Sequence, residues 1–162
     1  MKVYSITSRT RHLFSLDAIS ASGSANGSSG LNVRAETGGL LVLRGKAAGL
    51  YPINDISFGA GTVDISATAE ITQLYYSGNV SNIDAQTFYS TRWEGNISVD
   101  IGFSVGVNAS YANVANNEYV LGLGISVGVG VSATVVAGNV NWGASGSNAK
   151  QIRNAINHEL TR

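Results

Sequence analysis

The feature that most constrains this chain is a long uncharged run in which apolar and small residues alternate. From Tyr119 to Val140 the sequence holds no charged residue, and every odd position from Tyr119 to Ala137 is apolar. Most even positions between them are glycine, serine or threonine. A period of two places each set on its own face of a β-strand, whereas a helix would scatter both sets around its circumference. We therefore expect a strand here, although the run has the length of a membrane-spanning helix and contains a GxxxG pair.

A second alternation of the same kind precedes the first. The odd positions from Ile97 to Tyr111 are all apolar, and the even positions between them are small or polar. The segment that separates the two alternations contains Asn116-Asn117, and asparagine tolerates the left-handed backbone that turns require. Residues 97–137 are therefore predicted to form one long β-hairpin.

Composition supports an all-β chain. A length of 162 residues suits one domain, and 20 glycines with a single proline favour an antiparallel sheet over helices. We predict an antiparallel sandwich or barrel-like domain over residues 1–162. The Gly/Ser-rich tract at 20–30 is expected to be a flexible loop, and apolar residues at helical spacing within 148–162 predict a short C-terminal helix.

Charge and cysteine content exclude several classes of function. Ten basic and ten acidic residues balance, so no basic field favours nucleic acid. Without cysteine the chain has no disulfide, thiolate nucleophile or Cys-ligated metal. No uninterrupted apolar run follows Lys2, so no cleavable signal peptide is visible in this chain.

The two histidines do not build a recognisable catalytic or metal site. His158-Glu159 begins like the zinc-protease motif HExxH, but Arg162 stands at the position of the second histidine. His12 has no G-x-S-x-G nucleophile elbow to serve. We therefore predict no catalytic, metal-binding or cofactor-binding residue and a non-enzymatic protein; hydrolysis through His12 or His158, or a ligand-binding module, is the lesser alternative.

Two segments resemble parts of toxins. The stretch 97–137, ISVDIGFSVGVNASYANVANNEYVLGLGISVGVGVSATVVA, resembles in texture the Gly/Ser-alternating stems of β-barrel pore-forming toxins. Its end, SVGVGVSATVVAGNV at Ser126 to Val140, looks like the Gly/Ala/Val-rich β segments of bacterial polymorphic toxins. The resemblance implies a hairpin that enters a membrane with its aliphatic face toward lipid.

We therefore expect an exported, toxin-like protein, secreted and membrane-associated on its target, that forms homo-oligomers and inserts this hairpin into lipid. The residues predicted to face the membrane are Ile101, Phe103, Val105, Val107, Leu121, Leu123, Ile125, Val127, Val129 and Val131. Aromatic residues suited to a sugar or a lipid head group are Tyr75, Tyr76, Tyr89 and Trp93. The competing hypothesis is a structural subunit of a fibre, shell or appendage, because long uncharged strand edges can pair with further copies. Core packing of the same aliphatic face is the third possibility.

Overall fold

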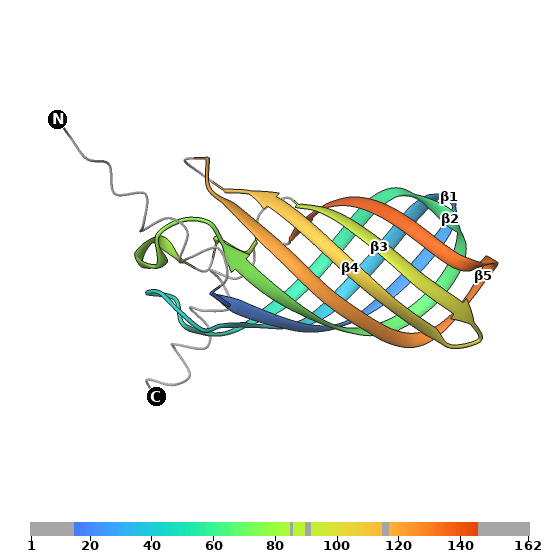
Figure 1. The fold of residues 1–162 in the computed structure, drawn as a ribbon, viewed down its shortest axis with the longest axis horizontal. Helices are drawn as coiled ribbons and strands as arrows, with labels where there is room; N and C mark the ends of the chain where they lie inside the picture. The colour runs from blue at the N-terminus through green and yellow to red at the C-terminus, as the bar shows by residue number, and fades with distance from the viewer. Residues whose placement is uncertain (1–14, 85, 90–91, 115–116, 146–162) are drawn as a thin grey trace.

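The chain folds into long antiparallel strands that form one curled sheet (Figure 1). The computed structural model describes residues 15–84, 86–89, 92–114 and 117–145. Within these residues the elements are β1 (Ala18–Val42), β2 (Gly49–Tyr76), the short 3-10 helix η1 (Val80–Asn82), β3 (Arg92–Ile101), β4 (Ser104–Asn113) and β5 (Tyr119–Ser145). The all-β antiparallel class predicted from the alternating residues is confirmed.

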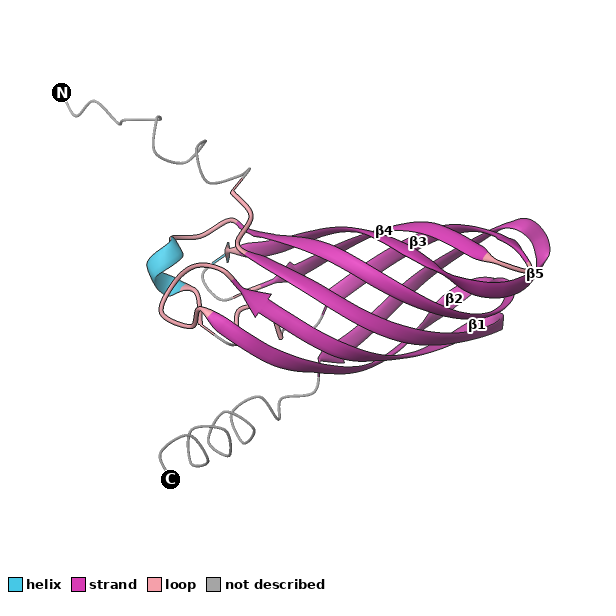
Figure 2. Ribbon diagram, turned by 90° about the horizontal axis from the view of Figure 1, so that it is seen from below, coloured by secondary structure: helices cyan, strands magenta, loops and turns pink. Residues whose placement is uncertain are grey.

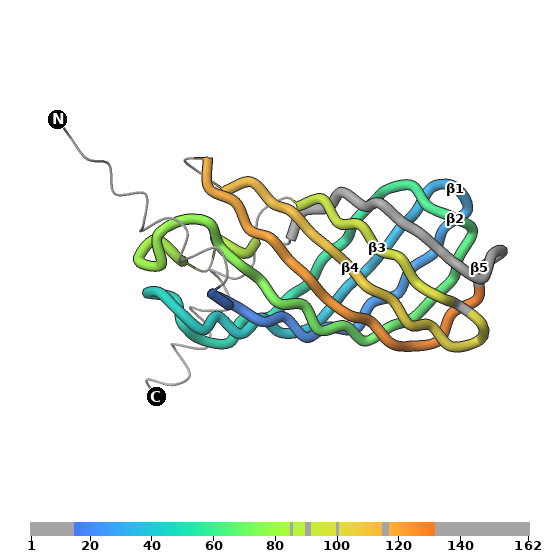
Figure 3. The backbone as a smooth tube through the Cα atoms, viewed as in Figure 1, coloured from blue at the N-terminus to red at the C-terminus, as the bar shows by residue number. Residues whose placement is uncertain are grey.

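The strand order is β1-β2-β5-β3-β4, and β4 pairs in addition with β5. β5 pairs with β2 along both of its halves. Its first half also pairs with β4, whereas its second half also pairs with β3. Because β3 and β4 pair with each other as well, these three strands enclose one side of the curled sheet, with β1 and β2 behind them (Figures 1 and 3).

Bends in the long strands produce the curl. The β1–β2 register shifts between Ser28 and Gly30, and the β2–β5 register shifts between Gly61 and Asp64. The two ends of β1 return to each other, because the Leu43 amide donates a 2.9 Å hydrogen bond to the Asp17 carbonyl. The bends lie at one end of the sheet, which we call the turn end, together with the β3–β4 turn (Figure 1). The described residues of the connections, 43–48, 77–84, 86–89, 114 and 117–118, lie at the opposite end, the loop end (Figures 1 and 2).

A conventional apolar core lies at the loop end. It consists of Ala18, Leu40, Val42, Ile53, Leu74, Tyr76, Ile83, Phe88, Tyr89, Ala112 and Val120. The segment that carries Ile83, Phe88 and Tyr89 thus packs against inward-facing residues of four strands. The Tyr89 hydroxyl donates to the Pro52 carbonyl, and burial, followed by the charge of Asp55, raises the pKa of Tyr89 to about 12.

Two predictions about local structure are wrong, and a third concerns residues that the structure does not describe. The Gly/Ser tract at 20–30 is not a flexible loop, because it forms part of β1 and pairs with residues of β2. Residues 97–137 are not one hairpin, because the chain turns at Gly102, whose φ of 93° is accessible to glycine, and so separates β3 from β4. The predicted turn near Asn116-Asn117 does lie between β4 and β5. The predicted helix at 148–162 lies outside the described residues.

Candidate functional site: an apolar exterior around a charged interior

The aliphatic residues predicted to face a membrane lie on the outside of the curled sheet. All ten are exposed, from 37% for Leu121 to 70% for Val131. In β5 the alternation is direct: Leu123, Ile125 and Val127 are exposed, and Ser126 between them is buried. The hairpin's aliphatic face is therefore not the core of this fold.

The exposed aliphatic surface continues over the strands that were not predicted to carry it. Large exposed residues on β1, β2 and β3 include Leu31, Val33, Leu41, Leu50, Ile56, Phe58, Val63, Ile65, Ile71, Ile97 and Val99. Among the described side chains, the exposed charged residues are Lys46 and Asp84, and both lie in loops. We call this exterior surface the aliphatic band. Apolar patches of this extent are unusual on soluble monomers and mark interaction surfaces.

Aromatic residues border the aliphatic band toward the loop end. Strand pairing places Trp93 opposite Tyr111 and both Tyr75 and Tyr111 opposite Leu121, so these residues lie at one level of the sheet. The rings of Tyr111 and Tyr119 stack with centroids 5.8 Å apart. Tyr75 and Tyr111 direct their hydroxyls to Gln73 and Asn113, at 2.7 Å each. We call Tyr75, Trp93, Tyr111 and Tyr119 the aromatic border.

The inside of the curled sheet is polar. The buried polar and charged residues of the strands include Ser20, Ser28, Asn32, Arg34, Glu36, Asp55, Asp64, Glu70, Ser98, Ser104, Asn108 and Ser126. Burying so many polar groups is unfavourable unless they satisfy one another. The structure links many of them into a network across the interior, whereas Ser28 Oγ and Ser126 Oγ have no hydrogen-bond partner.

Arg34 is the centre of this network. Its side chain is only 6% exposed, and its guanidinium forms ion pairs with Glu70 from β2, Glu94 from β3 and its own strand's Glu36. Glu70 also accepts hydrogen bonds from Asn108 of β4 and Ser24 of β1. One guanidinium therefore ties together strands from opposite sides of the interior.

Arg92 extends the network toward the loop end. It forms ion pairs with Asp55 at 2.8 Å, with Glu36 at 3.2 Å and with Glu94 at 3.6 Å. The two arginines thus face four carboxylates, Glu36, Asp55, Glu70 and Glu94, which leaves a formal excess of two negative charges. Because a carboxylate is costly to bury unpaired, the two guanidiniums stabilise the buried carboxylates of this interior. We call these six residues the charge cluster.

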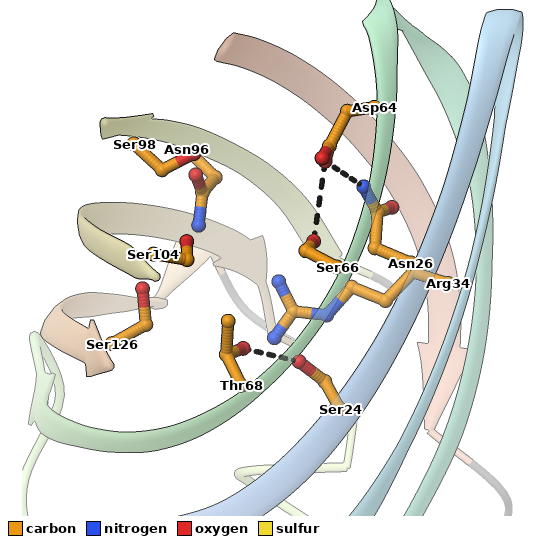
Figure 4. A pocket seen from close by; sticks show the side chains of 10 residues that line it. All are labelled: Ser24, Asn26, Arg34, Asp64, Ser66, Thr68, Asn96, Ser98, Ser104 and Ser126. Atoms are coloured by element: carbon orange, nitrogen blue, oxygen red, sulfur yellow. Dashed lines mark hydrogen bonds between the residues drawn. The ribbon is translucent and has the colours of Figure 1, made fainter. Parts of the chain in front are cut away.

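Toward the turn end, small hydroxyl and amide side chains fill the interior (Figure 4). Asp64 accepts hydrogen bonds from Asn26 at 2.7 Å and Ser66 at 3.2 Å, and Ser24 and Thr68 share one at 2.9 Å. The cavity among these side chains holds about 20 Å³, which is room for about one water molecule. The described side chains therefore leave little space in this part of the interior.

Glycine allows the curled sheet to close around these interior side chains. A Cβ on Gly38 would overlap the Ala21 carbonyl oxygen, and one on Gly128 would overlap that of Ala67. Any side chain at these positions would push neighbouring backbones apart. The small residues on the inward face therefore set how tightly the sheet curls.

The predicted aromatic site does not form one cluster. Tyr76 and Tyr89 are buried in the loop-end core, where the Tyr76 hydroxyl donates to Glu118. Trp93 is exposed and Tyr75 is half-buried, and both belong to the aromatic border on the exterior. His12 and His158 lie outside the described residues. Within the described residues, no group of His, Cys, Asp or Glu side chains could hold a metal ion.

Sequence reasoning missed the charge cluster. Its signal is a pair of charges spaced by two residues, as in Arg34 and Glu36 or Arg92 and Glu94, which puts both charges on the same face of a strand. The residues between and beside them, such as Val33, Ala35 and Trp93, are apolar. Charges on one face and apolar residues on the other were visible, but which face pointed inward was not.

Comparisons with known proteins returned no match to any family model, to any curated protein or to any solved structure. In the part of the chain that the structure describes, no helix has the length and apolar character needed to cross a bilayer. The arrangement of residues in the sheet is thus the basis on which function must be argued.

Proposed function

We propose that this protein inserts into lipid bilayers as a curled β-sheet closed into a barrel, with the aliphatic band in contact with lipid and the charge cluster inside. The observation that carries the proposal is the inverted distribution of polarity: Arg34 and Glu70 are buried, while Ile125 and Val131 are exposed. In water this arrangement would leave apolar surface solvated and bury charge, both at a cost. In a bilayer the same arrangement is favourable, because lipid contacts the aliphatic side chains and the ion pairs stay shielded.

The height of the aliphatic band supports the proposal. From Leu121 to Val131, β5 presents an apolar residue outward at every second position. These ten steps span about 33 Å along the strand, and the usual strand tilt of membrane barrels reduces that to about 25 Å along the barrel axis. This is the height of the apolar band that membrane barrels require. The aromatic border lies where a head-group region would then begin.

The width of the interior concerns whether the inserted protein conducts. A cavity of about 20 Å³ and the ion pairs that cross the interior support a narrow interior. We therefore propose a membrane-embedded barrel that does not conduct in this conformation. The proposal keeps membrane insertion from the sequence prediction and assigns it to the whole sheet of one chain rather than to a hairpin shared among several copies.

Flotation with phosphatidylcholine vesicles loaded with a self-quenching dye tests this proposal. The full chain is expected to float with the vesicles, to resist extraction by carbonate, and to leave the dye inside. Val127→Asp places a charge in the middle of the aliphatic band and should lower the floated fraction at least tenfold, because a charge at that depth costs about 2 kcal/mol or more. Asn113→Asp, at the exposed loop end of β4, is the matched control and should float normally.

The alternatives give different results in the same experiment. Protein that stays at the bottom of the gradient overturns membrane insertion. Ordered polymers in the absence of lipid would favour the fibre or shell subunit, and dye release with discrete oligomers would favour the oligomeric pore.

A further inference from the structure

The two ends of the curled sheet differ in charge, and the difference concerns the direction in which the sheet enters a membrane. The loop end carries Arg44, Lys46, Asp84 and Glu118 in its connections. The turn end is formed by short bends. Their residues are Ser28-Ser29-Gly30, Gly61-Thr62-Val63, Ile101-Gly102-Phe103 and the stretch 132–138, none of which is charged. The nearest charged residues in sequence are Asp64, which is buried and hydrogen-bonded inside, and Asp100.

The aliphatic band also ends differently at the two ends. Toward the loop end, the second half of β2 and β4 present the polar residues Gln73 and Asn113 together with the aromatic border, whereas β1 and the start of β2 still expose Leu41 and Leu50. Toward the turn end the aliphatic band continues to the last residues of the strands, with Leu31 exposed to 80%, Ile65 to 73% and Val131 to 70%. No described aromatic or charged side chain borders it there except Phe103, which is itself exposed and apolar. The turn end therefore has the composition of a surface that can lie in hydrocarbon.

Moving either end through the bilayer has a different cost. A charged side chain at the bilayer centre costs about 2.5–3.5 kcal/mol on insertion scales. The loop end would carry several such charges across, whereas the bends of the turn end carry none. Gly30 and Gly102 both adopt a φ of 93°, which is accessible to glycine and permits tight bends at this end.

We propose that the sheet enters a bilayer with its turn end leading, so that the loop end stays on the side from which the protein arrives. This inference rests on the proposed membrane insertion and adds its orientation. The lipid hydrocarbon is the partner of the turn end, and the head-group region of the near leaflet is the partner of the aromatic border. Orientation is then a property of the chain itself and needs no assembly machinery.

Single cysteines test the orientation, because the chain has none of its own. Ser29→Cys marks the turn end and Ala48→Cys marks the loop end, and both positions are exposed. Each variant is added to preformed phosphatidylcholine vesicles, recovered by flotation, and treated from outside with a membrane-impermeant charged maleimide. Cys at position 48 is expected to react at least tenfold faster than Cys at position 29, and the difference should disappear when detergent dissolves the vesicles.

The outcomes separate this inference from the proposal it rests on. If neither variant floats, membrane insertion itself fails. If both float but react equally, or position 29 reacts faster, insertion stands and the orientation is overturned. A second pair checks the physical cause: Ser29→Lys should slow insertion on the order of tenfold or more, whereas Ala48→Lys should leave the rate unchanged. Equal rates for the two lysine variants would also overturn the orientation.

Discussion

The loop end and the rest of the curled sheet, which we call the wall, are built from the same strands. They distribute polar and apolar residues between the inner and outer faces in opposite ways. In the wall, β1 directs Asn32, Arg34 and Glu36 inward, and a few residues later it directs Leu40 and Val42 inward. The inward face of β2 changes in the same sense, from Glu70 to Leu74. The inward face is therefore polar along the wall and apolar at the loop end. The even-numbered positions face inward in both regions.

The outward face changes in the opposite sense. Ile71 is exposed in the wall, and Gln73 follows it two residues later toward the loop end. On β4, exposed Val107 gives way to Tyr111 and Asn113. Along the second half of β2 and along β4, inside and outside thus exchange polarity, as the proposed change of surroundings from hydrocarbon to water would require. The comparison teaches that one strand pattern can serve two solvents if the composition of each face switches at the interface.

The largest expected effect comes from removing the arginine at the centre of the wall. Arg34→Ala leaves Glu70 and Glu94 buried without their shared cation, so the free energy of unfolding should fall by about 3–5 kcal/mol. Lys46→Ala is the control at the loop end, where an exposed side chain should contribute about 0.5 kcal/mol or less. Urea titration in detergent micelles, followed by circular dichroism, measures both. Equal losses would mean that the charge cluster does not hold the wall together.

Two isoleucines compare the ends directly. Ile83 is 1% exposed in the loop-end core, whereas Ile125 is 61% exposed on the wall. Ile83→Ala should lower the free energy of unfolding by about 2–4 kcal/mol through lost burial and a cavity. Ile125→Ala should change it by less than about 1 kcal/mol in micelles, since that side chain contacts no protein core. A larger loss for Ile125→Ala would show that the aliphatic band is packed against protein.

The smallest expected effect concerns a single hydroxyl at the loop end. Tyr89→Phe removes the hydrogen bond to the Pro52 carbonyl and should cost about 1 kcal/mol. Because the pKa of Tyr89 is raised to about 12, its neutral form favours the fold. Its contribution is complete below about pH 10, the ordinary tyrosine pKa, and is lost as the pH rises through 12. Burial and Glu118 also raise the pKa of Tyr76, so ultraviolet titration should detect two late-ionising phenols among the seven tyrosines. An unchanged number of late-ionising phenols in Tyr89→Phe would contradict the assignment.

Much of the fold was predictable from the period of two. The alternations around Ile65, Val105 and Val127 all lie in strands, and their apolar residues share one face. The turn at Gly102 was not predictable from periodicity, because Ile101 and Phe103 continue the alternation through the turn without interruption. The strand at 20–30 was missed because its outward residues are alanine and glycine, a composition that is also typical of linkers.

The site was predictable only in part. The alternation identified the aliphatic residues as one surface, but a strand pattern alone does not say which face points inward. That choice depends on residues far apart in sequence, such as Arg34 and Glu94, which are 60 positions apart and pair inside the curled sheet. The sequence around either residue does not reveal this pair, because the two residues meet only when the strands are arranged around the interior.

The separation of Arg34 from its partners also determines how the wall can assemble. Glu70 lies 36 residues along the chain from Arg34, within the β1–β2 hairpin, and Glu94 lies 60 residues along it, on β3. The β1–β2 hairpin contains Arg34 with Glu36, Asp55 and Glu70, whereas the second guanidinium comes from Arg92 on β3. A β1–β2 hairpin that entered hydrocarbon alone would therefore take unpaired carboxylates with it, at a cost of several kcal/mol. If the sheet enters a bilayer as proposed, we therefore expect the β1–β2 hairpin to associate with β3 before or during entry, rather than to enter first and alone.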